Sequence, residues 1–214
     1  AGWVLFHKPP GMDFEVYNDF NSNLANLYRC VRDKPSKLKY KLRYVLDSRE
    51  DFEYLALLHK RGILPRLYDV DRAAKFYQLI RYSYASGLDS FGSQPHSMWS
   101  DFPMIDLAAR RLQKVVIENK DFEKLIRQYD RPVSFFYCDP PYFATENYYK
   151  DVGFTAKDHI RLRDALLDIK GRFLVSYNDC PEIREIWKKP NIKIEEISRL
   201  NNLAQRYDGG CQYA

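Results

Sequence analysis

The run Asp139-Pro140-Pro141-Tyr142 places an acid, two rigid prolines and an aromatic ring directly after the apolar residues 136–138. Proline fixes φ and carries no amide proton, so the turn is stiff and the carbonyl of Pro140 is free to accept a hydrogen bond. Asp139 adds a second acceptor, and two acceptors on one turn suit an amino group with two protons, while Tyr142 offers a flat face for stacking. The run predicts a pocket for a nucleobase amine. An ordinary strand-ending turn is the alternative, because aspartate and proline are common in turns.

The segments around this run alternate between strand and helix from about residue 109 to the end, as a parallel sheet requires. Three apolar runs, at 115–117, 133–137 and 173–177, read as short strands that are buried on both faces. Helices are predicted at 121–129, at 155–169 and from Pro181 onward, and Thr155 and Asp158 have the spacing of a variant capping box. Ligands of such sheets bind at the carboxyl ends of the strands, which is where Asp139 stands.

The first half of the chain begins with a predicted strand over residues 15–17 and a helix that Asn21 or Ser22 can cap. Residues 33–108 have a different character and read as mostly helical. Within them a helix is predicted from Asp71 to Tyr84, and the glycines and serines of residues 87–93 predict a flexible loop.

The composition describes a soluble globular protein, and its 214 residues, 45% of them hydrophobic, suffice for one α/β domain with an inserted subdomain. No stretch approaches the roughly 18 apolar residues of a membrane span, so we expect no membrane partner and a cytoplasmic location. The four cysteines contain no Cys-x-x-Cys pair. His59, His96 and His159 lack metal-ligand spacing, so we expect no metal. The net charge of +5 favours a polyanionic partner, with a merely mildly basic protein as the alternative.

Asp-Pro-Pro-Tyr after an apolar strand resembles the signature of the amino-methylating DNA methyltransferases, specifically the Dam-like adenine class. Further segments are similar to motifs of that family in the same order. Residues 1–6 resemble the tail of its Phe-x-Gly-x-Gly cofactor motif, and residues 17–21 its acidic cofactor motif. Residues 119–122 resemble the Asp-Phe pair that holds the cofactor's adenine, and residues 173–179 the strand and turn downstream of the catalytic motif. The phenylalanine and first glycine of the cofactor motif and an upstream Pro-Gly-Gly-Lys-like segment are absent, so we expect a truncated start.

The resemblance implies a Rossmann-like α/β methyltransferase domain, residues 1–32 and 109–214, with a mostly helical target-recognition insertion at 33–108. It implies transfer of a methyl group from S-adenosylmethionine to the N6 amine of an adenine flipped out of double-stranded DNA, by a protein expected to be a monomer. The residues expected to hold the adenine are Asp139, Pro140, Pro141 and Tyr142. The residues expected to hold the cofactor are Gly2, Asp19, Asp121, Phe122 and Asp139. Close packing of Gly2, a capping role for Asp19 and a first-turn charge at Asp121 are the alternatives.

The basic stretch from Arg29 to Arg49 is predicted to contact DNA, through Lys37, Lys39, Lys41 and Arg43. A solvated helix face is the alternative. Tyr84 and Phe91, beside the flexible loop, and also Tyr82, could read or wedge bases, although aromatic residues at helical spacing usually belong to a core.

Two other functions are left open by the residues. One is methylation of the exocyclic amine of cytosine or of an RNA adenine, which would use the same pocket. The other is a DNA-binding module with a lapsed active site. Cys138 is interpreted as a buried strand residue, because methylation of an amine, unlike that of a ring carbon, needs no cysteine nucleophile.

Overall fold

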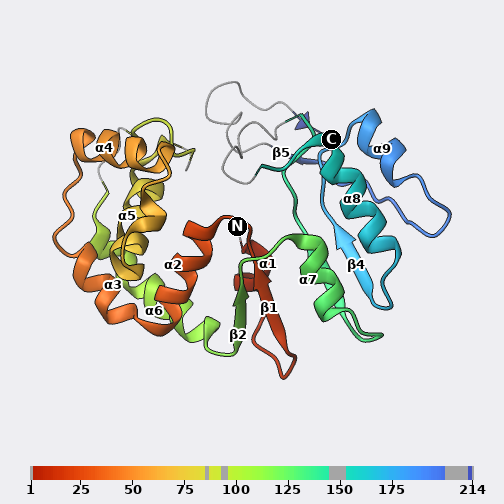
Figure 1. The fold of residues 1–214 in the computed structure, drawn as a ribbon, viewed down its shortest axis with the longest axis horizontal. Coiled ribbons are helices and arrows are strands. Elements are labelled where there is room, and N and C mark those ends of the chain that lie inside the picture. The colour runs from red at the N-terminus through yellow and green to blue at the C-terminus, as the bar shows by residue number, and fades with distance from the viewer. Residues whose placement is uncertain (1, 85–86, 93–95, 145–152, 201–211, 214) are drawn as a thin grey trace. The chain divides into compact units, whose positions relative to one another are not determined.

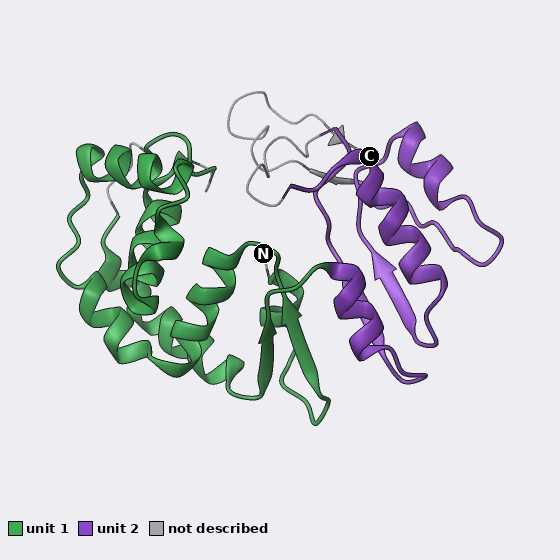
Figure 2. Cartoon of the chain, in the orientation of Figure 1, with its two compact units in different colours: residues 1–121 green, residues 122–214 purple. Residues whose placement is uncertain are grey.

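The computed structural model describes residues 2–84, 87–92, 96–144, 153–200 and 212–213 (Figure 1). The chain divides into two compact units, residues 1–121 and 122–214 (Figure 2). Each unit contains a pair of parallel strands and several helices, so the chain is of the mixed α/β kind. None of the described helices combines the length and the apolar character that crossing a membrane requires.

The first unit joins two parallel strands to a group of helices. Strand β1 (Glu15–Asn18) pairs with β2 (Val115–Glu118), with Glu15 opposite Val115 and Asn18 opposite Glu118. Between them in sequence come α2 (Ser22–Asp33), α3 (Pro35–Leu42), α4 (Arg49–Lys60), α5 (Asp69–Tyr82) and α6 (Phe102–Leu112), with 3-10 helices at Leu64–Arg66 and Met98–Asp101. A short helix, α1 (Trp3–His7), precedes β1. The prediction that residues 33–108 are mostly helical is confirmed.

Helix α2 begins where the sequence predicts. The side chain of Asn21 accepts hydrogen bonds from the backbone amides of Asn23 and Leu24, so Asn21 is the cap. Helix α5 ends at Tyr82, two residues before the predicted end, because the chain turns to an extended conformation at Ser83 and the Tyr84 amide donates to the carbonyl of Ser90 instead.

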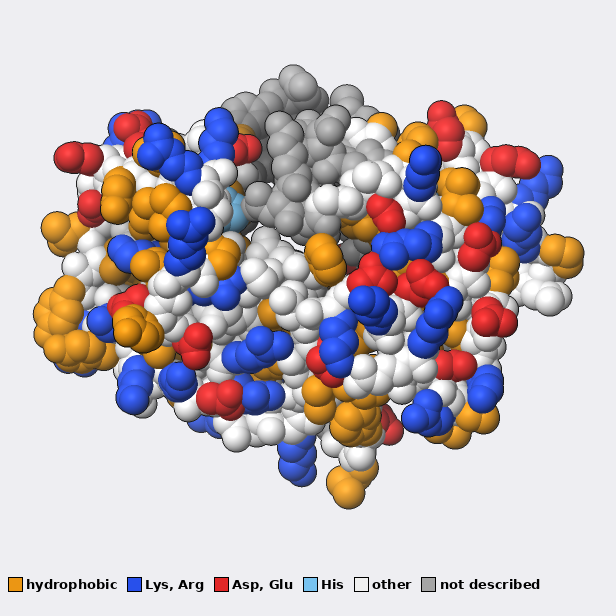
Figure 3. All heavy atoms as spheres, in the orientation of Figure 1, with side chains coloured by type: hydrophobic (Ala, Val, Ile, Leu, Met, Phe, Trp, Pro, Cys, Tyr) orange, Lys and Arg blue, Asp and Glu red, His pale blue; other side chains and the backbone are white. Residues whose placement is uncertain are grey.

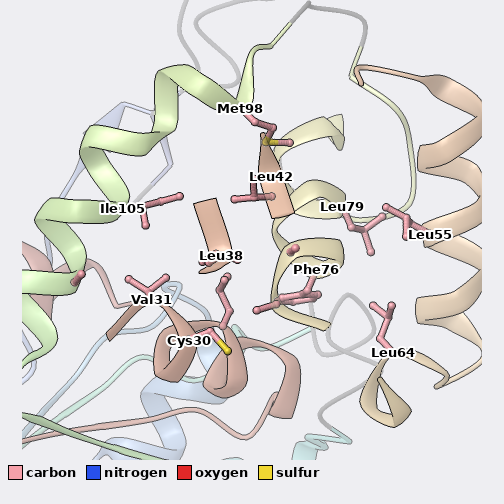
Figure 4. Packing of buried hydrophobic residues seen from close by; sticks show 14 of the residues in the cluster. Cys30, Val31, Leu38, Leu42, Leu55, Leu64, Phe76, Leu79, Met98 and Ile105 are labelled. Carbon is pink, nitrogen blue, oxygen red and sulfur yellow. The ribbon is translucent and has the colours of Figure 1, made fainter. Parts of the chain in front are cut away.

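One hydrophobic core holds the first unit together. It contains buried side chains from α2, α3, α4, α5 and α6 (Figure 4), among them Val31, Leu38, Leu55, Leu79 and Ile105. Each fully buried leucine contributes about 2 kcal/mol relative to an exposed one. Helix α2, which the sequence assigns to the catalytic domain, thus shares its core with the predicted insertion, and the boundaries proposed at 32 and 109 stay a prediction.

The second unit has a core of its own. Strand β3 (Phe135–Cys138) pairs in parallel with β4 (Arg172–Val175), and α7 (Phe122–Tyr129), α8 (Ala156–Leu167) and α9 (Pro181–Trp187) supply buried side chains that pack together. A short antiparallel pair, β5 (Arg199–Leu200) and β6 (Gln212–Tyr213), follows. The capping box of α8 forms as predicted, with the Thr155 amide donating to Asp158 Oδ2 at 2.7 Å.

The prediction that these strands are buried on both faces is wrong for β3 and β4. Phe136 and Phe173 pack into the core beneath the three helices, whereas Phe135 is 64% exposed and Leu174 is 49% exposed. The reason is that the helices of the second unit pack against one face of this strand pair, so successive side chains alternate between covered and uncovered positions.

The amino ends of β3 and β4 are joined unusually closely. Strand β3 starts at Phe135, later than predicted, because residues 131–134 form a turn in which the Ser134 amide donates to the Arg131 carbonyl. A Cβ added to Gly171 would lie 2.4 Å from the Ser134 carbonyl oxygen. Asp130 also connects the two segments, because its carboxylate accepts hydrogen bonds from the backbone amides of Lys170 and Gly171. Glycine is therefore required before β4.

Candidate functional site

The Asp-Pro-Pro-Tyr turn (residues 139–142) leaves β3 at its carboxyl end, beside the carboxyl end of β4. The ladder continues one step past the strands, where the Ser176 amide donates to the Cys138 carbonyl at 3.0 Å. The segment after β4 therefore runs next to the turn. Because neighbouring parallel strands end at the same edge of a sheet, residues far apart in the sequence meet here.

Asp139 is exposed and held from one side. Ser176 Oγ donates to Asp139 Oδ1 at 2.8 Å, and Tyr137 Oη lies 3.3 Å from the same hydroxyl. Among the described residues, no donor reaches Asp139 Oδ2 or the Pro140 carbonyl. Two acceptors on the turn are thus available to a ligand, which is the arrangement predicted for binding an amine with two protons. Pro141 and Tyr142 are partly buried beside them.

The residue that follows the turn is attached at three points. Phe143 donates its amide to Asn178 Oδ1 at 3.0 Å and accepts from Asn178 Nδ2 at its carbonyl at 3.3 Å. The ring of Phe143 packs beside His159, with 5.5 Å between ring centroids. His159 is fully buried on α8, and its Nδ1 lies 2.8 Å from Tyr177 Oη. His159, for which the sequence predicts no chemistry, is thus part of the packing beneath the turn.

A second cluster of candidate residues lies in the first unit, at the end of β1. Asp19 Oδ1 accepts from the Asn21 amide at 2.8 Å, and Tyr17 Oη donates to Asp19 Oδ2 at 2.9 Å. Burial raises the pKa of the Asp19 carboxyl, and these two hydrogen bonds oppose the rise. Asp19 is not the cap of α2, which is Asn21. Its carboxylate instead lies half-buried beyond the strand, in a fixed orientation.

Gly2 belongs to the same cluster. Its φ is +74°, a backbone conformation that residues with a side chain rarely adopt, and it is the N-terminal cap residue of α1. A Cβ at Gly2 would lie 3.1 Å from Tyr28 Oη. Tyr28 in turn packs against Tyr17, with 4.9 Å between ring centroids, and burial raises the pKa of Tyr28 to about 12. Two tyrosines thus connect Gly2 with Asp19, two residues that the sequence predicts separately.

The end of β2 is joined to the end of β1 by asparagines. Asn119 Nδ2 donates to the Asp19 carbonyl at 2.7 Å, and Asn18 exchanges hydrogen bonds with the backbone of Lys120. Asp121, predicted to hold the cofactor, follows directly and is half-buried. It is therefore carried by the same loop that fixes Asp19.

Phe122 opens α7 in the second unit and packs against that unit's core. The guanidinium of Arg161 lies over its ring, 4.2 Å from the centroid, and the ring of Phe154 lies 6.0 Å away. Arg161 thus covers one side of the ring through a cation–π contact.

The predicted DNA-contacting cations of α3 and its C-terminal end are mostly engaged within the protein. Lys39 Nζ bonds Asp106 at 2.6 Å and Lys41 Nζ bonds Asp71 at 2.9 Å. Arg43 lies over the ring of Trp99, 5.0 Å from its centroid. In the described part of the chain, Lys37 has no ion pair. On the face drawn in Figure 3, positive and negative side chains are likewise interspersed.

The three predicted base-reading aromatics lie in different environments. Tyr82 is 3% exposed and belongs to the core of the first unit. Phe91 packs against the buried ring of Phe52 at 5.6 Å, and the guanidinium of Arg49 covers it at 4.8 Å. Tyr84 is 50% exposed. Of the three, Tyr84 has the most surface for a ligand.

Four residues support the predicted ones although no role was predicted for them individually: Ser176, Asn178, Tyr17 and Tyr28. The signal for the first two is their place at the end of β4, since polar residues directly after a strand that neighbours Asp139 must lie beside it. The tyrosines gave no such signal, because an aromatic residue on a strand or helix reads as core.

Two acceptors on a rigid turn, with an aromatic neighbour, suit the binding of an amino group that carries two protons. The family model for D12 class N6 adenine-specific DNA methyltransferase matches residues 1–203, and the chain belongs to this family. It is 30% identical over 223 residues to the Type II methyltransferase M1.LlaDCHI of Lactococcus lactis subsp. cremoris, an alignment that covers 94% of this chain and 77% of that relative. The protein is a DNA adenine methyltransferase that acts at the N6 amine.

Proposed function

We propose that the protein methylates adenine in a specific sequence of double-stranded DNA, with S-adenosylmethionine as the methyl donor and Asp139 as the catalytic carboxylate. The observation that carries this assignment is the pair of free acceptors, Asp139 Oδ2 and the Pro140 carbonyl, on a turn that Ser176 and Asn178 hold. We further propose a Rossmann-like catalytic domain of residues 1–32 and 109–214. A target-recognition insertion at 33–108, a monomeric state and a cytoplasmic location stay predictions.

The residues of the first unit fit the proposed cofactor. Asp19 presents a half-buried carboxylate, which suits the hydroxyl groups of a ribose, and Gly2 presents backbone without a side chain beside Tyr28. Asp121 lies on the loop that is tied to Asp19. Phe122, in the second unit, offers an aromatic ring. When bound, S-adenosylmethionine supplies a methyl group carried on a positively charged sulfur.

The chain's own part in the reaction is to bind, orient and stabilise the amine. A base inside a duplex cannot present its amine and must be rotated out of the helix, at a cost of a few kcal/mol. Stacking on Tyr142 returns about 1 to 3 kcal/mol of that cost. Asp139 and the Pro140 carbonyl then accept hydrogen bonds from the two N–H groups of the amine, which orients the nitrogen. The positive charge that develops on this nitrogen is stabilised by the carboxylate where it forms.

Replacing the carboxylate tests this assignment. We expect Asp139→Ala to keep the fold but to lower kcat by about 100- to 1,000-fold, because it removes a preorganised charge from the transition state. The measurements are transfer of labelled methyl groups to duplex DNA, calorimetry of cofactor binding and thermal unfolding. The matched control is Asp164→Asn, an exposed acid of the same unit that, among the described residues, pairs with its neighbour Arg163. Near-normal turnover of Asp139→Ala would end the catalytic assignment.

A role in restriction and modification is part of the proposal, supported by the Type II methyltransferase to which the chain is similar. It is tested by expressing the protein in a host whose DNA lacks the modification. Mass spectrometry of the host's nucleosides should then show N6-methyladenine, at one recurring sequence when the DNA is read base by base. N4-methylcytosine in place of N6-methyladenine would show that the pocket takes the other amine.

A further inference from the structure

We propose that Asn178 is a positioning residue for methyl transfer, and that its carboxamide holds the Asp-Pro-Pro-Tyr turn at the distance from β4 that the reaction needs. The proposal rests on the proposed function of that turn. It assigns to Asn178 no contact with the adenine or the cofactor.

The carboxamide of Asn178 forms hydrogen bonds with both backbone polar groups of one residue, and this pair of hydrogen bonds is called the grip below. Its Oδ1 accepts from the Phe143 amide at 3.0 Å, and its Nδ2 donates to the Phe143 carbonyl at 3.3 Å. One hydrogen bond leaves a peptide free to rotate about it, whereas two on the same residue fix both position and orientation. Phe143 directly follows Tyr142, so the grip lies at the exit of the turn. Ser176, which bonds Asp139, lies at its entrance.

The side chains of residues 176–178 are used alternately. Ser176 and Asn178 both reach the turn, and Tyr177 between them points to the other side, where its hydroxyl meets the buried His159. This is the alternation of an extended chain. Since the ring of Phe143 also packs against His159, the segment after β4 holds Phe143 by its backbone and by its ring.

The backbone beyond the grip is strained. Ala144 has φ +65°, the left-handed region that residues other than glycine seldom occupy. Such a conformation persists only where the surrounding structure imposes it. Among the described residues, the hydrogen bonds on the immediately preceding Phe143 are those of Asn178. The prolines stiffen the turn internally but do not attach it to the sheet, so the exit of the turn is attached by Asn178, as its entrance is by Ser176.

The decisive variants are Asn178→Ala, which removes the grip, and Asn178→Asp, which makes it depend on pH. An ionised aspartate keeps the acceptor for the Phe143 amide but places a negative charge against the Phe143 carbonyl. A protonated aspartate is both acceptor and donor and so restores both hydrogen bonds. The matched control is Asp179→Asn, the next residue in the segment after β4. This variant alters the ion pair of Asp179 with Arg184 and leaves the contacts of Asn178 in place.

We expect Asn178→Ala to lower kcat per folded enzyme by about 10- to 100-fold, the cost of misplacing a catalytic group by about an ångström. The Kd of Asn178→Ala for S-adenosylmethionine should stay within about twofold of wild type, and so should the kcat of the control Asp179→Asn. For Asn178→Asp, kcat relative to wild type should rise as the pH is lowered from 8 to about 5.5, while the same ratio for Asn178→Ala stays flat. A purely structural role would lower the folded fraction without this pH dependence.

Two results would overturn the proposal. One is a kcat of Asn178→Ala within twofold of wild type, and the other is a flat pH ratio for Asn178→Asp. Asp139→Ala, assayed alongside, separates this proposal from the function on which it rests. If Asp139→Ala is inactive and Asn178→Ala is active, the positioning role alone fails. If Asp139→Ala is active, the catalytic role of the turn fails first.

Discussion

Glu15 carries a carboxylate whose ionised form is stabilised by basic side chains of the first unit. Arg111 donates two hydrogen bonds to its carboxylate, at 2.7 and 2.8 Å, and Lys8 donates a third at 3.0 Å. The side chains of Glu15 and Arg111 are only 13% and 10% exposed. The bonds from Arg111 are the main reason that the pKa of Glu15 is lowered. The same guanidinium also bonds the Leu5 carbonyl, so the pair joins α6 to β1 and α1.

We expect Glu15→Gln to lower the free energy of unfolding by about 2 to 3 kcal/mol at pH 7, because Arg111 is left without its partner charge. An acid whose pKa is lower in the folded state contributes stability above its unfolded pKa, and that contribution is lost as the pH falls through the folded pKa. The gap between wild type and variant should therefore close below a pH of about 4. Denaturant unfolding between pH 3 and 7 measures it.

The control for Glu15→Gln is Asp13→Asn, whose 76% exposed side chain pairs with Lys8 and with no other residue in the described part of the chain. Surface pairs of this kind are worth about 0 to 1 kcal/mol, so little change is expected. A gap for Glu15→Gln that persists unchanged at pH 3 would mean that the variant acts through packing and not through charge.

At the scale of elements, α3 and its C-terminal end carry the cations that the sequence assigns to DNA. Lys39 and Lys41 are paired with Asp106 and Asp71 in ion pairs that are partly open to solvent, which are worth about 1 kcal/mol each. DNA phosphates could replace these carboxylates at small cost. The ion pairs therefore do not exclude DNA contact, but they reduce what each cation gains from it.

Neutralising Lys37, Lys39, Lys41 and Arg43 together should weaken binding to duplex DNA and lower its salt dependence. Each lost phosphate contact lowers the slope of log K against log salt by about 0.9. We expect a decrease of about 2, less than four full contacts would give, because Lys39 and Lys41 already have partners. Fluorescence anisotropy over a range of salt concentrations measures the slope, and unchanged cofactor affinity shows that the fold is intact. An unchanged slope would mean that these cations of α3 and its C-terminal end do not contact DNA and only face solvent.

The elements also show what the sequence could predict and what it could not. The strand before Asp139, the cap at Asn21 and the box of Thr155 and Asp158 depend on nearby residues, and all three were predicted. The exposure of Phe135 and Leu174 depends on which face the helices cover, and an apolar run does not encode that. The grip of Asn178 on Phe143 joins residues 35 positions apart, so no local pattern announces it.

At the scale of the whole molecule, two units with separate cores imply that damage to one can be confined to it. Gly171→Ala would bring a Cβ against backbone oxygens of the second unit, at 2.4 Å from Ser134 and 3.0 Å from Arg131. Backbone cannot move aside cheaply, so we expect a loss of about 3 kcal/mol or more. Amide hydrogen exchange should show β3 and β4 losing protection while α2 and α5 keep theirs.

The control is Gly11→Ala, where the nearest atom to an added Cβ, an Asp13 carboxylate oxygen, lies at an ordinary 3.4 Å. Its exchange pattern should match that of wild type. Equal loss of protection in both units of Gly171→Ala would show that the two cores unfold as one.

The thiol of Cys138, next to the proposed catalytic carboxylate, lies where burial limits its reactivity. Burial raises the pKa of Cys138 to about 12, so at neutral pH the sulfur is almost entirely protonated. A thiolate is a stronger nucleophile than an adenine amine and would compete for any electrophilic methyl group bound nearby. Because Cys138 packs against the core of the second unit, we expect little thiolate at this position and therefore little methylation of its sulfur.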